Sequence, residues 1–261
     1  MGGSGRVVNR RRLRHGANRA KKGLKREFGM ETVTLTSAKG HSFVGHVAKP
    51  EGEFAGTPRG CVVVLHEAFG VTPHIKRVCE DFADQGYVAL APAMLSLAVN
   101  TADGVVLPQT KAGLDEARRL IEQTAQDDLL ALVQACIDWG REQGLKVALC
   151  GYCWGGSVAY MGGTHLKDVA VSICYYGGRI AELAREAQPA IPTLVHLARE
   201  DRYIPVDEAV NALRVNHPAA HVEVYEADHG FNRDDGVTYD PGAALVARRL
   251  TLDALLKNLA A

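Results

Sequence analysis

Residues 146–156 read KVALCGYCWGG, an apolar run that leads into a glycine-rich turn. The run over residues 146–150 predicts a buried strand, and the pattern over residues 154–161 predicts a helix. Cys153 therefore stands on the sharp bend between a strand and a helix, with a glycine two positions away on each side. This Gly-x-nucleophile-x-Gly pattern exposes a reactive side chain, and the helix N-terminus behind it favours a negative charge on the sulfur. Cys153 is our candidate nucleophile, against the alternative of a buried, inert thiol.

Short apolar runs alternate with amphipathic stretches along the rest of the chain. The expected strands are an opening hairpin at 31–37 and 42–48, and then 61–65, 87–91, 146–150, 169–175, 193–197 and 221–225. The expected helices are 73–85, 114–123, 127–141, 154–161, 179–187, 206–216 and a last one from about residue 241. Strands joined by helices require crossover connections. The sequence therefore predicts an α/β fold, a mainly parallel doubly wound sheet with an N-terminal antiparallel hairpin.

The basic residues are distributed unevenly. The chain has 261 residues and no net charge, but residues 1–29 hold ten Lys or Arg and one acid, Glu27, so this segment carries +9 and the remainder −9. We expect one domain over residues 30–261, preceded by a basic, disordered arm over residues 1–29. A start of translation at Met30 is an alternative to the arm. No aromatic residue interleaves the charges before Phe28, so we do not expect nucleic acid as a partner.

The cysteines and the apolar runs indicate the cellular compartment of the protein. Five of the six cysteines lie in apolar strand or helix patterns, where a thiol behaves as a small buried hydrophobe: Cys61, Cys79, Cys136, Cys150 and Cys174. None forms a Cys-x-x-Cys pair, and no apolar run has the length of a secretory core or a membrane span. We therefore expect a cytoplasmic protein with no membrane partner, acting as a monomer or a small homo-oligomer.

Two further reactive residues follow predicted strands. Asp201 comes after the strand at 193–197, and His229 comes after the strand at 221–225. Ligands of a parallel sheet collect at the carboxyl ends of its strands, and the chain order Cys, Asp, His is that of α/β-hydrolases. We predict that His229 accepts the thiol proton and that Asp201 orients its ring. The alternative partners of His229 are other acids near Asp201 in sequence or near the histidine itself: Glu200, Asp207, Glu208 and Asp228.

The sequence HEAFG at residues 66–70 follows the strand at 61–65. It does not complete the His-Glu-x-x-His zinc motif, and we expect neither a metal nor a cofactor. Its position suits the second amide of an oxyanion hole, so we assign the two donors to the backbone N–H groups of Trp154 and Ala68. Glu67 is then expected beside the Cys153 sulfur, the alternative being a surface carboxylate.

From about Glu31 to its end the chain resembles the dienelactone hydrolase family, also called carboxymethylenebutenolidases. The resemblance rests on these pieces: the sequence His66-Glu67-x-Phe69-Gly70, the cysteine-bearing turn at 151–156, Asp201 with Pro205, and His229-Gly230-Phe231 with Arg233. It implies an α/β-hydrolase fold and a carboxylic ester hydrolase.

The resemblance also implies roles for particular residues. Arg233 would hold the carboxylate of the substrate, and Glu67 would contact Cys153 in the resting enzyme and accept the thiol proton after substrate binds. The thiolate, paired with a charged His229, would then attack the lactone carbonyl. Aromatic residues beside these motifs are expected to contact the substrate: Phe69, Tyr152 and Phe231.

Two features depart from the family pattern. The second carboxylate-binding arginine has no unique counterpart, with Lys111, Arg118 and Arg119 as candidates, and residues 93–97 read AMLSL, which makes the pocket wall more apolar. Our leading hypothesis is a hydrolase of a carboxylated lactone or activated ester, with a small-molecule substrate as its partner. The alternatives are a thioesterase or general carboxylesterase, and a non-catalytic binding member of the fold.

Overall fold

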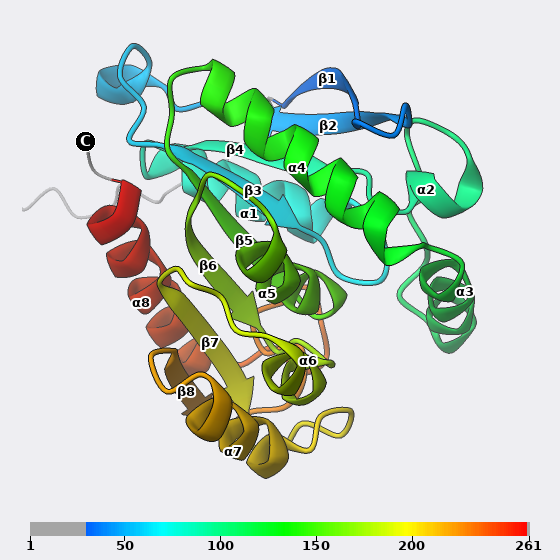
Figure 1. Ribbon diagram of the computed structural model, residues 1–261, viewed down its shortest axis with the longest axis vertical. Helices are drawn as coiled ribbons and strands as arrows, with labels where there is room; N and C mark the ends of the chain where they lie inside the picture. The colour runs from blue at the N-terminus through cyan, green and yellow to red at the C-terminus, as the bar shows by residue number, and fades with distance from the viewer. Residues whose placement is uncertain (1–29, 260–261) are drawn as a thin grey trace, which may run out of the picture.

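The computed structural model describes residues 30–259, in which eight strands form one sheet (Figure 1). The strand order is β1-β2-β4-β3-β5-β6-β7-β8. The strands are β1 (Glu31–Thr36), β2 (Ser42–Ala48), β3 (Cys61–Leu65), β4 (Val88–Pro92), β5 (Val147–Tyr152), β6 (Val169–Tyr175), β7 (Thr193–Ala198) and β8 (His221–Tyr225). The hairpin of β1 and β2 is antiparallel, β2 also runs antiparallel to β4, and the other pairs are parallel. The predicted fold class is confirmed.

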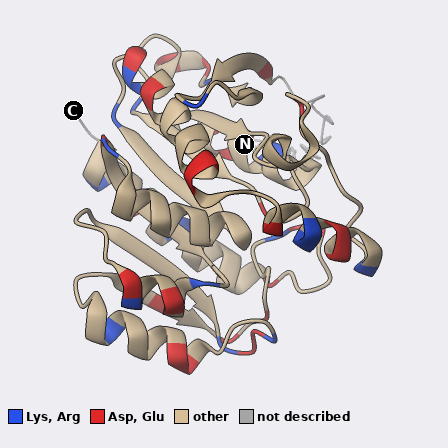
Figure 2. Cartoon of the chain, turned by 45° about the vertical axis from the view of Figure 1, so that its right-hand side comes forward, with Lys and Arg blue, Asp and Glu red and all other residues tan. Residues whose placement is uncertain are grey.

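Helices cover both faces of the sheet. The helices are α1 (Pro73–Asp84), α2 (Ser96–Val99), α3 (Lys111–Glu122), α4 (Gln126–Glu142), α5 (Trp154–His165), α6 (Ile180–Glu186), α7 (Val206–Asn216) and α8 (Pro241–Leu259), with a 3₁₀ turn at Gly52–Phe54. Helices α1 and α8 pack on one face, and α4 and α5 on the other, with α6 beside α5 (Figure 1). The charged residues lie mostly on these outer helices and on loops, and the central strands carry almost none (Figure 2).

Local capping explains where the helices of the site region begin. The Thr72 side chain accepts a hydrogen bond from the Ile75 amide, and Pro73 occupies the first turn of α1, where its missing N–H costs nothing. The Thr110 side chain caps α3 in the same way through the amide of Gly113, at 3.2 Å. Helix α3 therefore begins three residues before the predicted start at residue 114.

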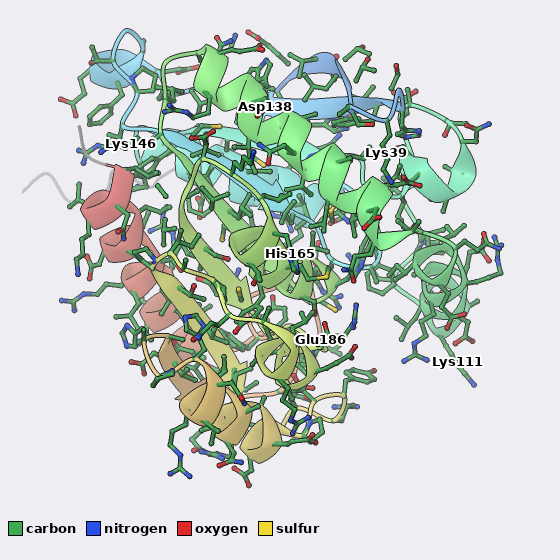
Figure 3. All side chains as sticks on the ribbon, viewed as in Figure 1. Lys39, Lys111, Asp138, Lys146, His165 and Glu186 are labelled. Carbon is green, nitrogen blue, oxygen red and sulfur yellow. The ribbon has the colours of Figure 1, made fainter. Side chains whose placement is uncertain are left out.

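The core surrounds β3 and β5, whose residues are buried throughout. The five cysteines predicted to be buried are buried and unpaired, as expected. The opening hairpin is fastened to α4, because Lys39 in its turn donates a hydrogen bond to Asp128 at 2.7 Å (Figure 3). Between residues 30 and 259 no helix is long and apolar enough to cross a membrane. The arm predicted at residues 1–29 lies outside the described residues.

The order of the strands positions the site. The chain passes from β3 to β4 on one side and later returns to β5 on the other side of β3. At such a switch point the loops after two neighbouring parallel strands diverge and leave a crevice at their carboxyl ends. The loop that carries Glu67 follows β3, and the turn that carries Cys153 follows β5.

Candidate active site

Cys153 stands between β5 and α5 with φ 54° and ψ −115°, a backbone conformation rare for residues other than glycine. Its amide donates a hydrogen bond to the carbonyl of Tyr175, the last residue of the neighbouring strand β6, at 3.0 Å. Unlike the other five cysteines, Cys153 is partly exposed. The turn therefore holds one sulfur at the carboxyl end of the sheet, as predicted.

The glycines of the turn allow backbone segments to approach closely. A Cβ on Gly151 would lie 1.8 Å from the Gly155 carbonyl oxygen, and one on Gly155 would lie 2.1 Å from the oxygen of Leu65 at the end of β3. A Cβ on Gly156 would lie 2.4 Å from the carbonyl oxygen of Tyr175. Real Cβ atoms do not come so close to backbone oxygens, so a side chain at any of these positions would push α5 away from the strands.

His229 and Asp201 meet at the same end of the sheet. The His229 Nδ1 atom and the Asp201 Oδ2 atom are 2.7 Å apart, and the Asp201 side chain is fully buried. The second carboxylate oxygen of Asp201 accepts hydrogen bonds from the amides of Tyr203 and Ile204, at 2.8 and 3.1 Å. The two amides thus fix the carboxylate, and its other oxygen fixes the orientation of the imidazole ring.

The alternative partners of His229 point elsewhere. Asp228 accepts a hydrogen bond from the His229 backbone amide and pairs with Arg202. The other acids bind arginines or face solvent: Asp207 pairs with Arg199 at 2.8 Å, Glu208 pairs with Arg185 at 2.8 Å, and Glu200 is exposed. Asp201 is therefore the acid that contacts the His229 ring.

The imidazole of His229 also lies near enough to Cys153 for the sulfur to act on its charge. Burial lowers the pKa of His229, but the negative charge of the Cys153 sulfur and the hydrogen bond to Asp201 outweigh it and raise this pKa to about 10. The site therefore favours a charged imidazolium whenever the sulfur is a thiolate.

His66 fixes the loop after β3. Its Nε2 atom accepts a hydrogen bond from the Met94 amide at 3.1 Å, so Nδ1 carries the ring proton. This N–H group donates a hydrogen bond to the Glu67 carbonyl at 2.5 Å. Burial lowers the pKa of His66 to about 4, which keeps the ring neutral. The Trp154 ring packs against the His66 ring with centroids 5.6 Å apart. The loop bearing the amide of Ala68 is thereby held against the first residue of α5.

The Glu67 carboxylate is buried beside Arg233. The Glu67 Oε2 atom lies 3.9 Å from Arg233 Nη1 and has no hydrogen-bond partner among the described residues. The guanidinium lies 5.9 Å from the centre of the half-buried Phe69 ring and 3.6 Å, through Nε, from Asp235 Oδ1. Its side chain is 18% exposed, which leaves it open to a ligand from solvent. Glu67 is thus a buried carboxylate, and the surface alternative is wrong.

The other residues expected at the substrate lie at different depths. Tyr152 is buried and stacks on Tyr175 with centroids 4.6 Å apart, and Phe231 is fully buried against Tyr225 at 5.0 Å. The candidates for a second carboxylate-binding group lie on α3: Lys111, Arg118 and Arg119. Arg118 and Arg119 pair there with acids of the same helix. Of the three aromatic residues expected at the substrate, Phe69 is the one whose ring lies beside the Arg233 guanidinium.

A family model described as the dienelactone hydrolase family matches residues 43–259. The chain belongs to the dienelactone hydrolase family. A putative carboxymethylenebutenolidase of Synechocystis sp. is 32% identical over 202 residues, 70% of this chain and 80% of that protein. The carboxymethylenebutenolidase of Pseudomonas putida is 30% identical over 238 residues, 86% of this chain and 95% of that protein.

Solved structures agree with the family. A putative dienelactone hydrolase from Klebsiella pneumoniae is 25% identical and superposes with a TM-score of 0.72, covering 86% of this chain and 98% of its own. A Pyrococcus furiosus esterase shares the fold at 15% identity, with a TM-score of 0.62 and coverage of 89% and 93%. This dienelactone hydrolase family member is a carboxylic ester hydrolase with the α/β-hydrolase fold.

One residue of this dienelactone hydrolase family member was not singled out in the sequence. Tyr176 directly follows β6, is fully buried, and has its ring 5.0 Å from that of His229. Its hydroxyl has no hydrogen-bond partner among the described residues. The only signal in the sequence is its place after a strand, in the sequence Tyr175-Tyr176-Gly177-Gly178.

Proposed function

We propose that this protein hydrolyses a carboxylated lactone or a related activated ester, with Cys153 as nucleophile, His229 as base and Asp201 as the residue that orients the base. The observation that carries the proposal is the His229 imidazole, which is bonded to the buried Asp201 carboxylate and whose charge is favoured by the nearby Cys153 sulfur. An imidazole fixed by a carboxylate activates a neighbouring thiol and stabilises the charged pair that forms.

Arg233 is the proposed site for the substrate carboxylate. A guanidinium meets a carboxylate with two parallel hydrogen bonds, which fixes the orientation of the bound acid. In the free protein its neighbours are the carboxylates of Glu67 at 3.9 Å and Asp235 at 3.6 Å. A substrate carboxylate at Arg233 would take the place of Glu67 and free it to move toward the sulfur.

The reaction then follows from the positions of these groups. Glu67 accepts the thiol proton, and the thiolate pairs with protonated His229. The sulfur attacks the carbonyl carbon, and the N–H groups of Trp154 and Ala68 bind the oxygen that becomes negative. The carbon–oxygen bond of the ring breaks and an enolate leaves. Water then attacks the acyl carbon and gives its proton either to the enolate oxygen or to His229, once that imidazolium has protonated the enolate. The carbon–sulfur bond breaks, the acid is released, and Glu67 returns its proton to the sulfur.

A general carboxylesterase or thioesterase is the second candidate. It is favoured because Arg118 and Arg119 pair with acids of their own helix α3, which leaves Arg233 as the arginine beside Glu67. A single arginine holds a carboxylate less firmly than two. The two candidates differ in whether an anionic group on the substrate speeds its hydrolysis.

We place this reaction in the cytoplasm, with a small-molecule ester as the partner. All six cysteines are unpaired, and unpaired thiols are typical of reducing compartments. A nucleophilic thiolate also needs a reducing environment to remain active.

The test is a substrate panel of dienelactone, p-nitrophenyl acetate and an acyl-CoA, with mass spectrometry of the acid-quenched enzyme. We expect dienelactone to have the highest kcat/KM and an acyl group to be trapped on Cys153. Cys153→Ala should lower kcat by about 10⁴-fold or more, as loss of the nucleophile does in triad proteases of unrelated fold. Full activity of this variant on every ester would disprove the mechanism.

Arg233→Ala separates the two candidates. It should raise KM about 10- to 100-fold for carboxylated substrates, the range for a charged hydrogen bond, and leave p-nitrophenyl acetate unchanged. Arg141→Ala, an exposed arginine at the end of α4, is the control. Equal losses on anionic and neutral esters would favour the general carboxylesterase.

A further inference from the structure

Three buried polar atoms around Cys153 have no hydrogen-bond partner among residues 30–259: Glu67 Oε2, Arg233 Nε and Tyr176 Oη. Buried polar groups in folded proteins are nearly always bonded, so each exception asks for an explanation. Arg233 has a role in the proposed function as the carboxylate site. Glu67 and Tyr176 remain as one buried acceptor and one buried donor.

The backbone holds Tyr176 in a fixed position. Its amide donates a hydrogen bond to the His196 carbonyl at 2.8 Å, and its φ is 36°, in the left-handed region that tyrosine rarely adopts. The ring is fixed between those of His229 and Phe231, at 5.0 and 5.3 Å. Strain of this kind persists where the surrounding structure requires one orientation, and it concentrates at functional sites.

Strand order places Glu67 and Tyr176 on opposite sides of the sulfur. Glu67 follows β3, Cys153 follows β5 and Tyr176 follows β6, and these three strands are consecutive in the sheet. Neighbouring strands lie about 4.8 Å apart, so side chains from β3 and β6 that lean over β5 come within reach of each other.

The charges around Tyr176 agree with this placement. Burial raises the pKa of Tyr176 well above its ordinary value, and the negative charge of Glu67 raises it more than that of Cys153 does. The phenol therefore keeps its proton and acts as a hydrogen-bond donor. Of the ionised groups near it, Glu67 acts on it most strongly.

We propose that Tyr176 is a positioning residue for Glu67, donating a hydrogen bond to the Glu67 carboxylate once a substrate has taken Arg233. This inference rests on the proposed function. When Glu67 moves, its carboxylate would lose the ion pair with Arg233. The Tyr176 hydroxyl then supplies a new hydrogen-bond partner for it. The thiol proton passes to the other carboxylate oxygen of Glu67, and Tyr176 keeps its own proton throughout.

The first experiment compares Tyr176→Phe with a matched control, Tyr160→Phe. Both tyrosines are fully buried, but the Tyr160 hydroxyl is bonded to His217 at 3.1 Å. Tyr176→Phe should lower kcat for carboxylated esters about tenfold or more, with KM within about twofold, and leave the Tm unchanged or raised. Tyr160→Phe should lower the Tm and keep kcat. A wild-type kcat in Tyr176→Phe, or an equal loss of kcat in both variants, would overturn the proposal.

A double-mutant cycle with Glu67→Gln then tests whether Tyr176 acts through Glu67. If it does, Tyr176→Phe has no further effect on kcat in the Glu67→Gln background, whereas independent roles give losses that multiply. The cycle is repeated with the rate of Cys153 alkylation by iodoacetate, which is independent of turnover. If the wild-type protein hydrolyses no ester, the proposed function fails, and multiplying losses in the alkylation cycle would separately refute the role of Tyr176.

Discussion

Cys153 holds its backbone at a positive φ, and the close approaches at Gly151, Gly155 and Gly156 leave no room for side chains around it. Holding a non-glycine residue in this region costs on the order of 1–3 kcal/mol. Interactions of the turn with the neighbouring strands and α5 compensate this strain, since the Cys153 amide is hydrogen-bonded to β6. The sulfur therefore stands at the carboxyl end of the sheet, where it acts on an imidazole that is itself fixed by Asp201.

The charge of Cys153 should be visible in the titration of His229. Cys153→Ser removes the negative charge that raises the pKa of His229 to about 10, so this pKa should fall in the variant. We expect the NMR signals of the His229 ring, recorded with a carboxylate ligand bound at Arg233, to titrate at a lower pH in Cys153→Ser than in the wild type. An identical titration in both proteins would contradict a thiolate–imidazolium pair.

The same shift predicts the pH dependence of stability. The folded-state pKa of His229 is raised above its ordinary value of 6.5, so protonation stabilises the fold. This contribution is fully present below about pH 6.5 and is lost as the pH rises toward 10. In Cys153→Ser the loss should occur at lower pH, which chemical denaturation across this range would detect.

For single residues, the sequence was informative where a reactive side chain follows an apolar run and has polar or glycine neighbours. Cys153, Asp201 and His229 all do so; in the structure His229 is bonded to Asp201, and the charge of Cys153 acts on the His229 ring. Tyr176 also follows a strand, but in the run Ile173-Cys174-Tyr175-Tyr176 it reads as one more apolar residue. Nothing in that pattern shows that the Tyr175 hydroxyl bonds to Thr251 while the Tyr176 hydroxyl has no partner.

Helix α1 holds the loop that carries Arg233. Arg77 on this helix binds the Asp234 carboxylate through two hydrogen bonds of 2.8 and 2.6 Å, and Asp235 through a third of 2.9 Å. His74, one turn earlier, binds Asp234 at 2.9 Å. The residues that follow Arg233 are thereby fastened to an element that begins beside the Glu67 loop.

Arg77→Ala should therefore weaken binding at Arg233 without touching the substrate. Exposed ion pairs contribute about 0–1 kcal/mol each, so we expect KM for carboxylated esters to rise about three- to tenfold, with kcat and neutral esters little changed. Steady-state kinetics on both substrate types would measure this. Arg248→Ala is the matched control, because Arg248 pairs with Asp81 of the same helix at 3.3 Å. An equal effect in the control would show a general loosening of α1.

Element boundaries were predicted to within a few residues, and the departures have local causes. Strand β5 extends to Tyr152, two residues beyond its predicted end, because Gly151 and Tyr152 continue to pair with β6. The short helix α2 was not predicted, since Ser96–Val99 is one turn long and carries no periodic pattern. Capping by Thr110 moved the start of α3, an effect that apolar periodicity does not report.

At the scale of the whole molecule, the sheet class followed from the sequence, but the order of its strands did not. Consecutive strands β3 and β4 are neighbours, whereas β5 lies on the far side of β3 and β2 lies beside β4. Apolar runs mark a strand as buried without saying which neighbour it pairs with. This order creates the crevice between the loops after β3 and β5, and it also makes Glu67 and Tyr176 flank Cys153.

The charge division of the chain gives a prediction that is independent of the site. Removing residues 1–29 deletes ten basic residues and one acid, so the net charge changes from zero to −9. The residues proposed for catalysis lie between Glu67 and Arg233, within the segment that forms the sheet and its helices. We therefore expect kcat/KM and Tm to stay within about twofold and 2 °C of the full chain, because every residue proposed for catalysis and every strand of the sheet is kept.

What should change is long-range electrostatics. At low salt the full chain should be retained on a cation-exchange resin through its ten additional basic residues, and the shortened chain, with a net charge of −9, should pass through. Salt should weaken this retention, because the Debye length is only about 10 Å at 0.1 M salt. Retention of the full chain should disappear as salt is raised. A shortened chain that loses hydrolysis while keeping its Tm would instead assign residues 1–29 a part in binding the ester, since the charge change alone leaves the chemistry at Cys153 intact.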